Sequence, residues 1–202
     1  QSLYIKVHYP LEYIVATINN GGGFYTPETY INEARILDAN IHAPCVNNSG
    51  KLTKIYNQEI FLGLSMIYEL NNEIIQKIES TKSKNGSFKN FNDFINRVDI
   101  PKKQLNLLIR IGAFRFTNKT KKELLWESCL RGNLPKPNSS SKLLFETNKN
   151  HTISNLEYHE NEDAFDELEL LGFTLCSPFS IIERKPKSYI RVKNMKKHLH
   201  KK

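Results

Sequence analysis

The sequence predicts a mainly α-helical protein of the α+β class that carries one small β-hairpin. Apolar residues recur at helical spacing in several stretches, which begin at a capping residue or a proline and end near glycine or asparagine. Two short runs of strand-forming residues, 52–56 and 59–62, flank the polar pair Asn57 and Gln58, which is typical of a hairpin. A two-stranded hairpin is marginal by itself, so we expect it to lie on helices.

The first helices are expected within the N-terminal 40 residues. Pro10 begins one helix, and the glycines at 21–23 end it. Its inner face consists of Leu11, Ile14, Val15 and Ile18. Thr26 is expected to cap a second helix, with Pro27 at its first position and Asn40 placed for a left-handed cap. The inner face of this helix is assigned to Ile31, Ala34 and Leu37. The segment 41–44 is expected to be extended.

Residues 63–132 are expected to be helical, with two helix–loop–helix units following each other in 63–112. The expected cap residues are Asn71 or Asn72, Asn90 with Asp93 for a helix over 91–98, and Thr120 with Glu123. The loop 99–101 leads into a helix whose apolar face carries Leu105, Leu108 and Ile109. A glycine, Gly112, stops that helix.

The C-terminal third changes character. Residues 133–161 are expected to form a linker, because 134–141 are rich in proline and serine. A short helix through Ala164, Phe165, Leu168 and Leu171 should end at Gly172. Its acidic residues are assigned to a solvated face opposite Phe165 and Leu168. We therefore divide the chain into 1–62, 63–132, 133–161, 162–183 and 184–202.

Charge is unevenly distributed along a chain whose net charge is +8. Between residues 82 and 122 only Asp93 and Asp99 oppose a long series of lysines and arginines. Such a balance favours nucleic acid or another acidic surface as the partner. The tail 184–202 contains no acidic residue, so it is either a phosphate-binding segment or a solvated linker, and we expect it to be poorly packed.

The sequence lacks the motifs of a complete active site. Its three cysteines stand far apart, and neither they nor the histidines have metal-ligand spacing. Neither a phosphate-binding glycine loop nor a nucleophile–base pattern is present. We therefore expect no bound cofactor or structural metal, unpaired thiols in the cytoplasm, and no membrane span. The missing initiator methionine suggests a cut inside a longer protein.

Five segments, in order, resemble bacterial replicative polymerases of the C family, the DNA polymerase III alpha subunits. They are 3–13 ("LYIKVHYPLEY"), 30–47 ("YINEAR" and "IHAPCVN"), 61–67 ("FLGLSMI"), 88–114 ("FKNFNDFINRVD" and "IGAF") and 169–179 ("ELLGFTLCSPF"). Each segment is weakly specific alone, whereas five in order are specific.

The resemblance implies that the chain covers the end of the fingers and the tandem helix-hairpin-helix region that grips template–primer duplex DNA. It further implies that the chain stops before an oligonucleotide-binding domain. The palm, with its catalytic carboxylates and magnesium, would lie upstream, so we expect this fragment of a nucleotidyltransferase to be inactive alone. The family has a Gly-Val-Gly turn in the first hairpin, where this chain has Glu69-Leu70-Asn71. We therefore expect the first hairpin to stand off the DNA.

The expected DNA contacts are basic residues of the helix-hairpin-helix region. Lys102 and Lys103 lie at a helix start, where backbone N–H groups and the helix dipole also favour phosphate. The full set is Lys84, Lys89, Lys102, Lys103, Arg110, Lys119, Lys121 and Lys122. The alternatives are a scaffold that binds other replisome subunits, with an incidental basic face, and a complete enzyme of unknown type.

Overall fold

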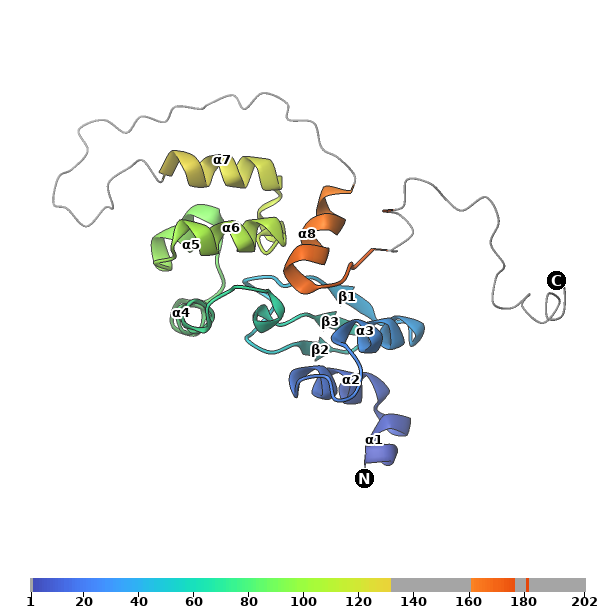
Figure 1. Ribbon diagram of the computed structural model, residues 1–202. Helices are drawn as coiled ribbons and strands as arrows, with labels where there is room; N and C mark the ends of the chain where they lie inside the picture. Colours follow the sequence, from blue (N-terminus) through green and yellow to red (C-terminus); the bar gives the residue numbers. More distant parts are fainter. Residues whose placement is uncertain (1, 132–160, 177–180, 182–202) are drawn as a thin grey trace, which may run out of the picture.

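A computed structural model describes residues 2–131, 161–176 and 181 of the chain (Figure 1). Its helices are α1 (Ser2–His8), α2 (Pro10–Asn19), α3 (Pro27–Ile36), α4 (Asn72–Asn85), α5 (Phe91–Arg97), α6 (Lys102–Arg110), α7 (Lys121–Arg131) and α8 (Glu162–Leu171). Two 3-10 turns, η1 (Leu64–Met66) and η2 (Arg115–Thr117), complete the helical part. The predicted α+β class is confirmed. The predicted linker and basic tail, Asn161 apart, lie outside the described residues.

A three-stranded sheet lies between the N-terminal helices and the helical region that follows (Figure 1). Strands β2 (Lys54–Tyr56) and β3 (Glu59–Phe61) form the predicted antiparallel hairpin, with Asn57 in the left-handed region at φ 57°. The extended segment contains a third strand, β1 (Asn40–His42), which pairs in parallel with β3. Helix α2 packs on β2 and α3 packs on β1, so the hairpin is supported as expected.

Two expectations for α3 are wrong, namely the residue at its left-handed end and the burial of Leu37. Thr26 stands at the N-cap with Pro27 first in the helix as predicted, but its hydroxyl lies 3.2 Å from that of Thr29 and makes no capping bond to the helix backbone. The helix also ends earlier than expected. Asp38, rather than Asn40, is the left-handed residue (φ 60°). Asn40 instead begins β1. This early turn leaves Leu37 outside the core with 38% of its surface exposed, whereas Ile31 and Ala34 are buried as predicted.

The core of the helical region is built around phenylalanine rings. Phe91 and Phe94 both contact Phe114, and Phe88 contacts Phe94; each pair meets edge to face with ring centroids 4.9–5.0 Å apart. Edge-to-face contacts of this kind are favourable because the positive ring edge meets the negative face. These rings hold α5 against the end of α6 and so fix the base of the second helical hairpin.

Local capping fixes the starts of α5 and α7. The Asn90 side chain accepts a hydrogen bond from the Asp93 N–H at 2.8 Å. Thr120 and Glu123 form the reciprocal capping box, with bonds of 2.7 and 3.2 Å. Both predicted caps are confirmed, and α5 ends one residue before the predicted limit. Asn71 precedes α4 as expected but makes no side-chain capping bond.

Helix α8 packs on a different face from the predicted one, although Ala164 and Leu171 are buried as expected. Its buried residues are Ala164, Leu170 and Leu171, whereas Phe165 and Leu168 are 55% and 48% exposed. The acidic face, expected in solvent, turns toward α6 and the start of α7. Electrostatics accounts for the reversal, because these two helices present basic side chains that the α8 carboxylates neutralise.

Candidate nucleic-acid interface

The second helical hairpin presents the start of α6 to solvent. Its arms are α5 and α6, and the extended residues Val98 and Pro101 flank its turn. Pro101 precedes α6 with φ −62° and ψ 145°, which orients the first helical turn. Lys102 and Lys103 lie in that turn and are exposed. The free N–H groups and partial positive charge of a helix start favour an anion at the place where these two ammonium groups lie.

The turn of the first helical hairpin lies directly beside this helix start. Glu69 has φ 61°, a left-handed conformation that glycine adopts without strain. The Glu69 carboxylate lies 2.9 Å from the Lys103 ammonium, and both side chains are mostly exposed. The two hairpin turns thus form one surface, on which Glu69 partly neutralises Lys103.

Three of the lysines predicted to contact DNA are exposed and form no ion pair among the described residues. Among the described residues, no ion pair involves the side chains of Lys84, Lys89 or Lys102, and all three are exposed. Lys82 differs from them, because its ammonium donates to the carbonyls of Asn47 and Ser49 at 3.2 and 2.8 Å. Partial burial lowers the pKa of Lys82. It therefore stabilises a turn of the fold and is a poor candidate for phosphate contact.

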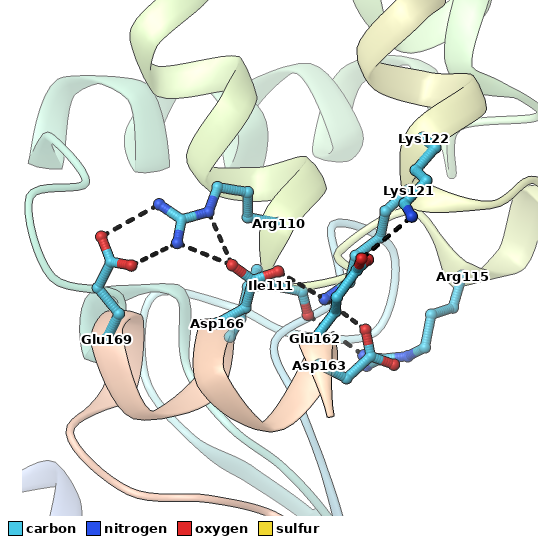
Figure 2. A network of polar contacts seen from close by, with 9 residues as sticks. All are labelled: Arg110, Ile111, Arg115, Lys121, Lys122, Glu162, Asp163, Asp166 and Glu169. Atoms are coloured by element: carbon cyan, nitrogen blue, oxygen red, sulfur yellow. Dashed lines mark hydrogen bonds and ion pairs between the residues drawn. The ribbon is translucent and has the colours of Figure 1, made fainter. Parts of the chain in front are cut away.

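The other predicted contacts lie in intramolecular ion pairs, most of them with α8 (Figure 2). The Arg110 guanidinium donates to Asp166 at 2.8 Å and to both oxygens of Glu169. The remaining pairs are Lys121 with Asp163 and Asp166 at 2.7 and 3.0 Å, Lys122 with Glu162 at 3.0 Å, and Lys119 with Glu127 at 2.8 Å. These four cations already have carboxylate partners, so phosphate would have to displace them.

Further contacts fix the chain that follows α8. The Tyr68 N–H donates to the carbonyl of Leu170 at 2.8 Å. Arg35 donates to the carbonyl of Leu175 at 2.5 Å. The Glu167 carboxylate accepts the N–H of Leu175 at 2.6 Å. Together with the buried apolar residues of α8, these bonds make the helix an integral part of the fold.

Sequence reasoning placed the α6 lysines correctly on an exposed helix start, but it missed two features. The first is the acidic helix that covers Arg110, Lys121 and Lys122. A signal for it existed in the excess of carboxylates in 160–169, which matches the basic excess in 82–122. The second is Gln104, a buried polar residue between the two hairpins that no motif identifies.

Comparison with known proteins agrees with this geometry. A family model described as a helix-hairpin-helix motif matches residues 38–124. The chain is 33% identical over 132 residues to the DNA polymerase III subunit alpha of Borreliella burgdorferi, which covers 61% of this chain and 11% of that protein. It is 31% identical over 118 residues to the subunit from Thermus aquaticus, covering 56% of this chain and 10% of that protein.

This chain is homologous to part of the DNA polymerase III alpha subunit. It is also 30% identical over 128 residues to the error-prone DNA polymerase of Mycobacterium tuberculosis (strain CDC 1551 / Oshkosh), covering 62% of this chain and 12% of that protein. The family resemblance stated from the sequence is confirmed. The matches span about a tenth of the length of these polymerases.

The described part of this polymerase homologue offers no cluster for a metal ion. No three histidine, cysteine or acidic side chains gather there at metal-binding distance. In the same ranges, no helix has the length and apolar character needed to cross a membrane.

The carboxylates of α8 make its attachment sensitive to acid. Hydrogen bonds from Arg110 hold the pKa of Glu169 below its ordinary value. A lowered pKa in the folded state stabilises the fold above the ordinary carboxyl pKa, and this stabilisation is lost as the pH falls through the folded pKa. Burial raises the pKa of Glu167, so this residue acts in the opposite direction. We expect the attachment of α8 to weaken below the ordinary glutamate pKa of about 4.3, and to be lost as the pH falls through the lower pKa of Glu169 in the folded state.

Replacing Arg110 by leucine should loosen α8 at neutral pH. The Arg110→Leu change leaves Asp166 and Glu169 without their guanidinium partner, which weakens the attachment of α8. Amide hydrogen exchange of residues 168–172 should accelerate about tenfold. Lys119→Leu is the matched control, because its partner Glu127 lies on α7. Equal exchange in both variants would contradict an ionic attachment of α8.

Proposed function

We propose that this chain is the part of a DNA polymerase that holds template–primer duplex DNA by its phosphates, without reading base sequence. The observation that carries the proposal is the exposed start of α6, where Lys102 and Lys103 stand beside the turn of the first helical hairpin. The helix-hairpin-helix match and the named polymerase relatives support it.

The chemistry of this surface suits phosphate rather than bases. Lysine ammonium groups act as mobile point charges, and helix-start N–H groups suit the oxygens of a phosphate. Bases are usually read by bidentate side chains such as arginine or asparagine in the major groove. The arginines nearest the surface, Arg97 and Arg110, are occupied with Asp93 and with the α8 carboxylates. Binding should therefore be independent of sequence.

A second candidate function is a scaffold that binds other subunits of a replication complex. Large exposed apolar side chains on the N-terminal side of the molecule favour it. Leu3 and Val7 on α1 are 80% and 72% exposed, and Phe24 in the turn between α2 and α3 is 93% exposed. Exposed apolar side chains of this size, where they gather in one patch, are typical of surfaces that contact another polypeptide.

The salt dependence of duplex binding tests the phosphate proposal against the scaffold. If Lys84, Lys89, Lys102 and Lys103 each neutralise one phosphate, log K should fall with log salt at a slope of roughly −3.6. Fluorescence anisotropy with duplexes of unrelated sequence, at several salt concentrations, measures both slope and sequence preference. A slope near zero, or a strong preference for one duplex, would overturn the proposal.

A further inference from the structure

Gln104 lies where the two helical hairpins meet and makes both hydrogen bonds of its amide there. Its side-chain N–H donates to the carbonyl oxygen of Glu69 at 2.9 Å, and its side-chain oxygen accepts the N–H of Asn71 at 2.7 Å. The residue is 6% exposed, so it is one of the few buried polar side chains of the described part. It belongs to the same first turn of α6 as Lys102 and Lys103.

These two bonds span the turn of the first hairpin. Glu69 and Asn71 flank Leu70, and Glu69 has its strained left-handed backbone. Buried polar groups cost free energy unless they are paired, so the Gln104 amide is well suited only to the observed position of this turn. The same turn leads directly into α4, whose cap Asn71 is itself held by Gln104.

We propose that Gln104 is a positioning residue that fixes the first hairpin against the second, so that the starts of α4 and α6 bind one phosphate backbone as a unit. The inference rests on the function proposed above. Under this arrangement the first hairpin contributes to DNA binding through its position, although its Glu69 carboxylate is repelled by phosphate. Loss of the Gln104 bonds frees the turn and removes phosphate contacts that the two helix starts share.

Replacement of Gln104 by glutamate tests this role, because it should make duplex binding depend on pH. A protonated carboxyl can still donate to the Glu69 oxygen and accept from Asn71, whereas an ionised carboxylate can only accept. An ionised carboxylate at position 104 would be repelled by the backbone carbonyl of Glu69, while the nearby Lys103 ammonium is already paired with the Glu69 side chain. Because burial raises the pKa of a carboxyl group, Gln104→Glu should bind a duplex within about twofold of wild type at pH 5 and about tenfold more weakly at pH 8.

Two further variants separate the positioning role of Gln104 from the effect of an added negative charge. Gln104→Leu introduces no titratable group, so this variant should bind duplex weakly at every pH. Its salt slope should be shallower by about one because one phosphate contact is lost. Gln58→Glu introduces the same charge on the exposed turn between β2 and β3 and should track wild type at both pH values. All measurements are made on the 202-residue chain, below the onset of thermal unfolding of each variant.

The outcomes distinguish this inference from the proposed function. If wild type binds no duplex, the proposed function fails. If wild type binds and both Gln104 variants match it in affinity, pH profile and salt slope, the positioning role alone is overturned. A lower melting temperature with unchanged affinity also overturns it, because Gln104 would then only stabilise the fold. A pH-dependent loss confined to Gln104→Glu, with a shallower slope in Gln104→Leu, supports it.

Discussion

Reversing the charge of both Lys102 and Lys103 is expected to weaken duplex binding about a hundredfold at low salt, by the same factor on every sequence. Each lysine supplies one charge-assisted contact, and two such contacts amount to about 3 kcal/mol, or two powers of ten. The salt slope should become shallower by about 1.8, because two phosphates are no longer neutralised. Anisotropy titrations of Lys102→Glu with Lys103→Glu, on several duplexes, measure both quantities.

A second double substitution serves as the control, because it separates the effect of the α6 surface on binding from the effect of net charge. Lys51 and Lys54 are exposed, and Lys54 begins β2, which Figure 1 shows apart from α6. Lys51→Glu with Lys54→Glu changes the net charge by the same amount and should weaken binding only slightly. Equal losses in both pairs would show that binding follows net charge alone. Unaltered binding and slope in the α6 pair would favour the scaffold function.

The parts of the fold that the sequence predicted well are those fixed by local interactions. Asn90 and Thr120 bond to groups three residues away, so the starts of α5 and α7 follow from nearby residues alone. Helical spacing likewise identified the buried face of α2. The hairpin β2–β3 is local in the same sense, because its strands are joined by a two-residue turn.

The features that the sequence did not predict depend on partners far away in the chain. The Arg110 guanidinium meets α8 56–59 residues away, and no local pattern gives that pairing. Phe165 and Leu168 resemble a core face by hydrophobicity, yet the ionic contacts of the opposite face decide how the helix lies. In the sequence, Gln104 is only one polar residue at a helix start. Its structural role becomes visible from its two hydrogen-bond partners, which lie 33 and 35 residues away in the chain.

This distinction also bears on the eight predicted DNA contacts. They were predicted from their charge and their place in the sequence, and on these grounds Arg110 and Lys121 cannot be distinguished from Lys102. Three-dimensional placement separates them, because the carboxylates of α8 pair with the first two and not with the third. Pairing with the acidic helix α8 thus leaves the two hairpin turns and the exposed lysines at 84, 89, 102 and 103 as the candidate interface.

Replacing Phe114 by alanine should have the largest effect on stability. The ring is 0% exposed and lies at the centre of the aromatic core, with centroids 5.0 Å from Phe91 and 4.9 Å from Phe94. Truncating a buried phenylalanine to alanine costs about 3–5 kcal/mol through lost transfer free energy and the cavity left behind. Domains of this kind have only about 5–15 kcal/mol of stability, so a large fraction would be lost.

Urea denaturation followed by circular dichroism measures this loss, and Phe165→Ala is the matched control. Phe165 is 55% exposed on the outer face of α8, so the same truncation should change stability by less than about 0.5 kcal/mol. Since the Phe114 ring holds α5 against the end of α6, duplex binding by Phe114→Ala should fall in proportion to the unfolded fraction. Equal destabilisation by the two variants would contradict the assignment of Phe114 to the core and of the outer α8 face to solvent.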